Sequence, residues 1–178
     1  MKRVLIAAFG DTGNEPEALR QVLESFGCLV LIQYIGRPND FISVLIGATP
    51  FDPDVVILSC HGEDGRIIMP VLDDSIYAAN EPKGNLSSDK ISKHLKLTKK
   101  TIINTGCTTG SADLVGVFGR DNSYIAPASY IEGNAVLLFM VDFFYQMLQN
   151  KYSAYDAWNH AKALDKETAQ FVFRSGIT

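Results

Sequence analysis

The sequence has few cysteines and no concentration of basic residues. Of its 178 residues three are cysteine, at positions 28, 60 and 107, and none is spaced as CxxC. An odd number of widely separated cysteines does not predict a disulfide framework, and without CxxC the common zinc-binding patterns are excluded. The formal net charge is -4, and no basic cluster contains interleaved aromatic residues. We therefore expect no bound metal and no nucleic-acid partner.

Long apolar runs are also missing. The most apolar segment, AVLLFMV (135–141), ends at Asp142 and is far shorter than the roughly 20 residues that cross a bilayer. The opening MKRVLIAAFG lacks a cleavage site and runs into Gly10-Asp11, which favours a first strand over a signal peptide. We expect a cytoplasmic protein with reduced thiols and no membrane partner.

The composition is that of an ordinary globular protein, with 47% hydrophobic and 20% charged residues. The length suits a single domain over residues 1–178. Apolar runs alternate with segments of helical periodicity, which predicts an α/β fold: a mostly parallel sheet with helices on both faces. The expected strands are 3–9, 28–35, 54–60, 101–106, 123–129 and an edge strand at 168–174, and the expected helices are 15–27, 39–47, 87–97, 110–118, 134–150 and 153–164.

In such sheets the active crevice lies beyond the carboxyl ends of the strands. One of these ends carries ILSCHGEDG (57–65), which places a cysteine beside a histidine. Neighbouring residues of a strand point to opposite faces, so Cys60 and His61 are not expected to hydrogen-bond to each other. Cysteine is among the most buried residue types, and we expect Cys60 to pack in the core. His61 comes where the strand ends, and Gly62 allows a sharp turn that exposes the imidazole and a backbone N–H.

The partner that we expect for His61 is Cys107, in TIINTGCTTG (101–110) at the end of the next buried strand, 46 residues further along the chain. Strands 54–60 and 101–106 are expected to be neighbours, so the two side chains would face each other over the crevice. A histidine there would increase the thiolate fraction of the cysteine and later protonate a leaving group.

This pattern, a strand followed by HG and a later strand followed by CxxG, resembles the caspase-haemoglobinase fold of clan CD cysteine peptidases. The succession continues through FFYQML (143–148) and SAYDAW (153–158), which is similar to bacterial CHAT domains. The likeness covers roughly residues 54–165. It implies a caspase-like three-layer sandwich.

The resemblance also implies roles for individual residues. His61 is the expected general base and acid, Cys107 the nucleophile, and the N–H groups of Gly62 and Cys107 the oxyanion hole. The expected reaction is hydrolysis of a peptide or protein substrate through a thioacyl-enzyme, without metal or cofactor. Asp11, Glu63 and Thr105 are expected to line the substrate pocket.

The sequence departs from the subgroups of known specificity. Clan members that cut after Arg or Lys often carry an acidic residue shortly before the cysteine, where this chain has Asn104, Thr105 and Gly106. Cleavage after Asp uses arginines, and only Arg37 and Arg66 lie near the crevice loops. Neither preference is predicted, and a non-catalytic caspase-like interaction module stays open as an alternative.

Two other functions remain open. GDTGNEPE (10–17) is similar to the phosphate loop of flavodoxins, which would make the chain an FMN- or phosphate-binding domain. The C-H-G triplet also occurs at the nucleophile turn of amidotransferase-like hydrolases, with Cys60 as nucleophile, but that turn should lead into a helix. Separately, an exposed C-terminal edge strand could pair with a second copy in a homodimer.

Overall fold

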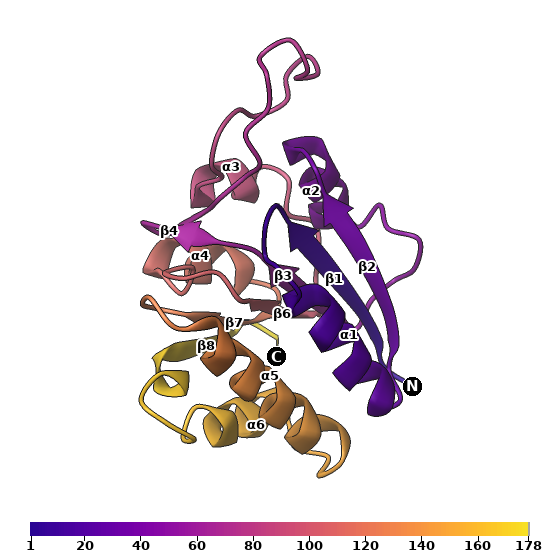
Figure 1. The fold of residues 1–178 in the computed structure, drawn as a ribbon, viewed down its shortest axis with the longest axis vertical. Coiled ribbons are helices and arrows are strands. Elements are labelled where there is room, and N and C mark those ends of the chain that lie inside the picture. Colours follow the sequence, from indigo (N-terminus) through magenta and orange to yellow (C-terminus); the bar gives the residue numbers. More distant parts are fainter. Residues whose placement is uncertain (178) are drawn as a thin grey trace.

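The computed structural model describes residues 1–177 and contains a central sheet of six strands (Figure 1). The order across the sheet is β2-β1-β3-β6-β7-β8. All neighbours are parallel except β7 and β8, which are antiparallel. The strands are β1 (Arg3–Phe9), β2 (Leu29–Ile35), β3 (Val55–Ser59), β6 (Thr101–Asn104), β7 (Ser123–Pro127) and β8 (Phe171–Ser175), and the short hairpin β4 (Gly62–Glu63) and β5 (Arg66–Ile67) stands apart from them.

Helices cover both faces of this sheet. Alternate residues of each strand point to opposite faces, so the strands divide their apolar side chains between two clusters. The helices that pack on one cluster are α2 (Pro38–Leu45), α3 (Ser88–Ser92) and α4 (Ala112–Phe118); those on the other are α1 (Glu15–Ser25), α5 (Gly133–Leu148) and α6 (Ala154–Ala161). The predicted mostly parallel α/β sheet with helices on both faces is confirmed.

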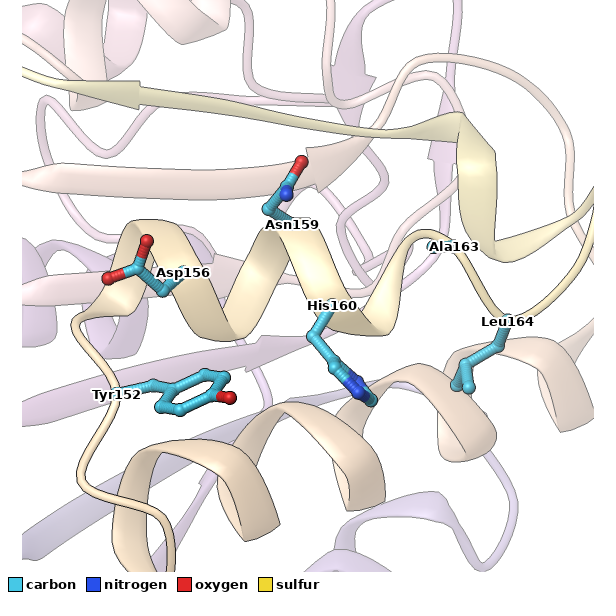
Figure 2. A pocket seen from close by; sticks show the side chains of 6 residues that line it. All are labelled: Tyr152, Asp156, Asn159, His160, Ala163 and Leu164. Atoms are coloured by element: carbon cyan, nitrogen blue, oxygen red, sulfur yellow. The ribbon is translucent and has the colours of Figure 1, made fainter.

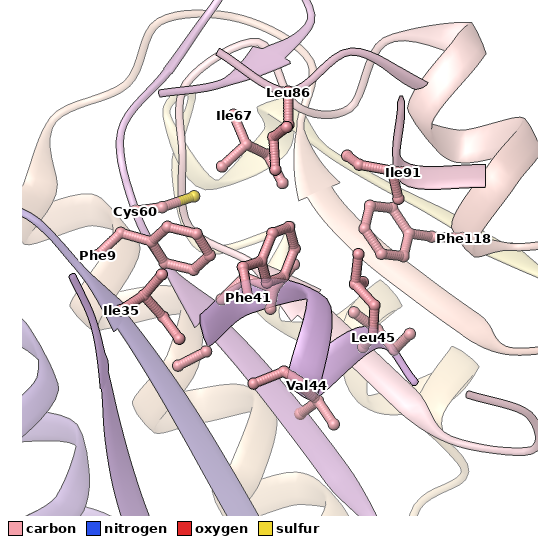
Figure 3. Close-up of a cluster of buried hydrophobic side chains, with 14 of the residues drawn as sticks. Phe9, Ile35, Phe41, Val44, Leu45, Cys60, Ile67, Leu86, Ile91 and Phe118 are labelled. Atoms are coloured by element: carbon pink, nitrogen blue, oxygen red, sulfur yellow. The ribbon is translucent and has the colours of Figure 1, made fainter. Parts of the chain in front are cut away.

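The first cluster shows how the buried core is built (Figure 3). Phe41 of α2 lies beside Phe9 of β1, and Leu45 of the same helix lies toward Phe118. The Phe9 and Phe41 rings meet edge to face, with centroids 4.8 Å apart, an arrangement that aromatic quadrupoles favour. This packing holds the carboxyl ends of β1 and β2 in place, and the crevice opens beside them.

Tertiary contacts shorten two of the predicted elements. The helix expected over 87–97 ends at Ser92, because the N–H groups of Lys96 and Leu97 donate to the Leu45 carbonyl at the end of α2. The edge strand expected from residue 168 begins at Phe171. Before it, Thr168 exchanges hydrogen bonds with Asp165 in a tight turn that continues as a 3-10 helix, Thr168–Gln170.

The segment between β5 and α3 extends away from the sheet at the top of Figure 1. Glu81 anchors it: this side chain has no exposed surface and receives two hydrogen bonds from the Arg37 guanidinium, at 3.0 and 2.5 Å. Backbone N–H groups of Asn39 and Ala78 donate to the same carboxylate. The hydrogen bonds from Arg37 lower the pKa of Glu81 to about 2. Within residues 1–177, no helix is long and apolar enough to cross a membrane.

Candidate functional site

A cavity of about 400 Å³ lies at the carboxyl ends of β1, β3 and β6, between α1 and α5. The loop after β1 and the start of α1 form one wall, and the start of α5 forms the opposite wall. Cys60 and His61 contribute from the end of β3, and Thr105 and Cys107 from the end of β6. β3 and β6 are paired neighbours, with Leu58 opposite Asn104, as the sequence predicts. The two residues predicted to react therefore line one cavity.

The His61 ring is exposed and oriented by a backbone carbonyl. Its Nε2 lies 2.7 Å from the carbonyl oxygen of Asp11, in the loop after β1. A carbonyl oxygen can only accept, so this contact assigns the proton of the neutral ring to Nε2. The lone pair is then on Nδ1, which is free to accept a proton. Asp11 thus contributes to the site through its main chain, a role that the sequence does not reveal.

Cys107 is half-buried and follows β6 in a tight turn. Its sulfur lies 3.7 Å from the Ile131 carbonyl oxygen, just before α5. The Cys107 backbone N–H makes no hydrogen bond within residues 1–177. The next residue, Thr108, has a φ of 58°, which is strained for a β-branched residue and is the kind of backbone geometry that clusters at functional sites.

Gly62 and Gly106 allow the two loops to touch. A Cβ at Gly62 would collide with the Cys107 carbonyl oxygen, and a Cβ at Gly106 would lie 3.0 Å from the Gly62 nitrogen. The sequence suggests Gly62 for a sharp turn. The structure gives a different reason, since only a residue without a side chain permits this close backbone contact. The backbone next to His61 therefore packs directly against the backbone at Cys107.

Cys60 directly follows β3, and although it contributes to the cavity lining, the residue is buried. It is 4% exposed and packs in the cluster with Phe9 and Ile67 (Figure 3). Its sulfur donates to Asn104 Oδ1 at 3.2 Å. Burial raises the pKa of the Cys60 thiol far above its ordinary value, so this sulfur stays protonated and is a poor nucleophile.

Glu15, the first residue of α1, lies at the floor of the cavity and was not among the predicted site residues. Its Oε1 accepts hydrogen bonds from Ser59 Oγ at 2.6 Å and from Thr105 Oγ1 at 2.8 Å. Burial raises the pKa of Glu15, while these hydroxyl groups and the nearby His61 act in the opposite direction. Thr105, predicted to line the pocket, does so and also positions this carboxylate.

Glu63 and Asp11, also predicted to line the pocket, are not among the residues that line this cavity. Glu63 is exposed in β4, and Arg66 is exposed in β5. Arg37 is paired with Glu81, as described above.

A second cavity of about 580 Å³ lies beside α6, with Tyr152, Asp156, Asn159 and His160 along it (Figure 2). His160 points from α6 toward α5, where its Nδ1 lies 2.8 Å from Asp142 Oδ2. The described residues that line this cavity include no cysteine or serine.

Within residues 1–177, no group of three or more His, Cys, Asp and Glu side chains is arranged to hold a metal ion. Comparison with models of known protein families and with curated proteins finds no match.

Proposed function

We propose that the chain is a cysteine endopeptidase of the caspase-haemoglobinase type, with His61 and Cys107 as its catalytic dyad. The observation that carries the proposal is the joint position of the two residues. They follow neighbouring parallel strands and line one cavity, and the Asp11 carbonyl accepts from His61 Nε2, which leaves Nδ1 as the proton acceptor of the neutral ring. The mostly parallel sheet, closed by one antiparallel edge strand, agrees with the resemblance in the sequence.

In the proposed reaction, His61 Nδ1 accepts the thiol proton and Cys107 Sγ attacks the carbonyl carbon of the scissile peptide bond. The tetrahedral intermediate collapses as His61 returns the proton to the leaving amine, which breaks the C–N bond and leaves a thioester. Water, deprotonated by His61, then attacks the thioester carbonyl; the C–S bond breaks, the acid is released, and His61 returns the proton to the Cys107 sulfur. The hydrogen bond from His61 Nε2–H to the Asp11 carbonyl persists throughout and stabilises the transient imidazolium.

The developing oxyanion needs donors that are free and fixed. The Cys107 N–H has no internal partner within residues 1–177, and the Gly62 backbone is held against the Cys107 carbonyl. We propose these two N–H groups as the oxyanion hole, because preorganised donors stabilise charge without reorganising during the reaction.

The alternative functions have less support. A phosphate or FMN in the loop after β1 would meet the Glu15 carboxylate, which faces the same cavity. The amidotransferase-like mechanism needs Cys60 as nucleophile, yet its thiol is buried and the chain continues into the hairpin β4–β5. A non-catalytic interaction module would retain the same fold, and only an activity measurement separates it from a peptidase.

The test is hydrolysis of a fluorogenic peptide library by the purified chain, with Cys107→Ala and Cys60→Ala as matched variants. We expect the unaltered protein and Cys60→Ala to release fluorophore, and Cys107→Ala to be inactive. Iodoacetamide should label Cys107 first, at a rate that falls when His61 is replaced. A protein that cleaves no peptide and whose Cys107 reacts no faster than a small free thiol would contradict the proposal.

We also propose a homodimer through β8, which forms one edge of the sheet and has its ladder partner on one side only. An unpaired edge can add a strand from a second copy. Light scattering after size-exclusion chromatography should give twice the monomer mass, and Ser175→Pro, which removes one N–H that points away from β7, should lower it. A monomer at micromolar concentration would contradict this proposal.

A further inference from the structure

We propose that the cavity beside Cys107 receives a positively charged side chain, lysine or arginine, whose cationic head pairs with Glu15. Given the proposed peptidase function, on which this inference rests, that side chain is the one immediately before the cleaved bond. The sequence provides no such preference, because the three residues before Cys107 carry no carboxylate. The structure brings a carboxylate to the cavity from the start of α1, 90 residues from Thr105 in the chain.

The Glu15 carboxylate is fixed in a way that leaves one oxygen available. Both hydroxyl donors, Ser59 and Thr105, bind Oε1. Within residues 1–177, Oε2 has no hydrogen-bond partner, and it is not among the side-chain atoms sealed from solvent without one. Ser59 and Thr105 are themselves buried at the strand ends, so they hold the carboxylate at the floor. Oε2 is therefore positioned to accept from a donor that enters the cavity.

The charge of the cavity favours a cation. Among the described residues that line it, none is lysine or arginine. His61 lines the same cavity, and its charge acts to lower the pKa of Glu15. A carboxylate that is removed from water without a fixed positive partner is destabilised, and an incoming ammonium or guanidinium compensates it. Burial raises the pKa of Glu15, which agrees with a carboxylate that lacks a fixed positive partner.

The walls suit the stem of such a side chain. The apolar residues that line the same cavity as Glu15 are Ala18 of α1, Ile131 just before α5, and Val136 and Leu137 in α5. Lysine and arginine bury their methylene stems along apolar surface while the charged head meets a polar group. An aspartate or glutamate would instead place a second carboxylate against Glu15, which costs free energy. The geometry thus discriminates between charges of opposite sign.

The experiment uses acyloxymethyl ketone peptides that differ only in the residue occupying the cavity: arginine, lysine, citrulline or aspartate. Labelling of Cys107 is followed by mass spectrometry in the unaltered protein, in Glu15→Gln and in Glu17→Gln. Glutamine keeps the oxygen that Ser59 and Thr105 bind. Glu17 is the matched control, because it lies on the outside of the same helix and pairs with Arg20.

We expect arginine and lysine probes to label Cys107 about tenfold or more faster than the citrulline probe, since charge-assisted hydrogen bonds are the strong ones. This preference should collapse in Glu15→Gln and persist in Glu17→Gln. Equal labelling by arginine and citrulline probes in the unaltered protein, which needs no variant to fold, would overturn the inference and leave the dyad intact. An equal loss for all probes in Glu15→Gln would also overturn it, by assigning Glu15 to the orientation of His61.

If no probe labels Cys107, the proposed peptidase function is contradicted. A binding measurement then tests the cation site independently of catalysis. Calorimetry compares 4-aminobenzamidine with its neutral analogue 4-aminobenzamide on the Cys107→Ala protein. Tighter binding of the cation by about tenfold, lost in Cys107→Ala/Glu15→Gln and retained in Cys107→Ala/Glu17→Gln, supports a cation site regardless of catalysis. Equal or undetectable binding of the two compounds overturns it.

Discussion

Each of the two cavities contains a histidine whose ring is held by an oxygen acceptor, yet the two differ in chemistry. In the cavity between α1 and α5, a backbone carbonyl orients His61, and Cys107 lies on the same surface. In the larger cavity beside α6, the Asp142 carboxylate holds His160, and the described lining offers no thiol or serine hydroxyl. An oriented histidine is common, whereas one that shares a cavity with a nucleophile and a free N–H donor is a candidate for catalysis.

The most direct test of this difference between the cavities is to replace each histidine in turn. We expect His61→Ala to lower kcat/KM for peptide hydrolysis by about 10²–10⁴-fold, the range typical of a general base. His160→Ala should change it by less than about twofold, because that ring lies in another cavity and its loss removes no reacting group. Initial rates with the best library peptide measure both variants. Equal losses in the two would show that the distinction between the cavities is wrong.

The second prediction concerns the close contact between the loops that carry His61 and Cys107. A Cβ at Gly62 would meet the Cys107 carbonyl oxygen and the Thr109 side chain, so Gly62→Ala must push the loops apart. We expect a loss of about 10²-fold in kcat, comparable to removing one oxyanion donor. Gly116→Ala is the control, because a Cβ there meets nothing within 4 Å and alanine favours helix α4. A fully active Gly62→Ala protein with an unchanged melting temperature would contradict the prediction.

The third prediction uses the pKa of Glu15. Because burial raises it, the folded protein binds a proton more tightly than the unfolded chain. The associated stability is fully present below the ordinary pKa of glutamate and is lost as pH rises through the folded value. Glu15→Gln should therefore raise the free energy of unfolding at pH 8, and should change it much less at pH 4.

Urea titrations at the two pH values measure the effect of Glu15→Gln. Glu17→Gln serves as the control, since Glu17 pairs with Arg20 at the surface and a surface pair contributes little. A Glu15→Gln protein that is less stable than the unaltered one at pH 8 would mean that the carboxylate is fully compensated by its hydroxyl donors. In that case the ionised Glu15 carboxylate would need no positive partner, and this argument for a cation site would be lost.

Part of the site could be predicted because it depends on strand order. Apolar runs separated by helices predict a parallel sheet, and buried strands 54–60 and 101–106 follow each other at its centre. The rule that parallel strands present their carboxyl ends at one edge then brings His61 and Cys107 together. Strand alternation likewise predicts that Cys60 packs away from His61, and its 4% exposure agrees.

The rest depends on contacts that no local pattern encodes. Glu15 reads as an ordinary acidic residue in the first turn of a helix, and its hydrogen bonds to Ser59 and Thr105 span 44 and 90 residues. The Asp11 contribution is a backbone carbonyl, which every residue type possesses. A usable signal did exist for Glu15: it opens the helix that directly follows the first strand, so it stands at the same edge as His61.

The smallest expected effect belongs to the pair between His160 and Asp142. The His160 side chain is 48% exposed, and even a charged pair open to solvent stabilises a fold by at most about 1 kcal/mol. In a double-mutant cycle with His160→Ala and Asp142→Asn, we expect a coupling free energy of about 0.5 kcal/mol. Asp142 also accepts from Gln146 Nε2 at 3.0 Å, so its single replacement should cost slightly more than that of His160. A coupling free energy above about 2 kcal/mol is expected of a buried polar network rather than of an exposed pair. It would mean that His160 is rigidly oriented in the cavity beside α6, as a functional residue would be.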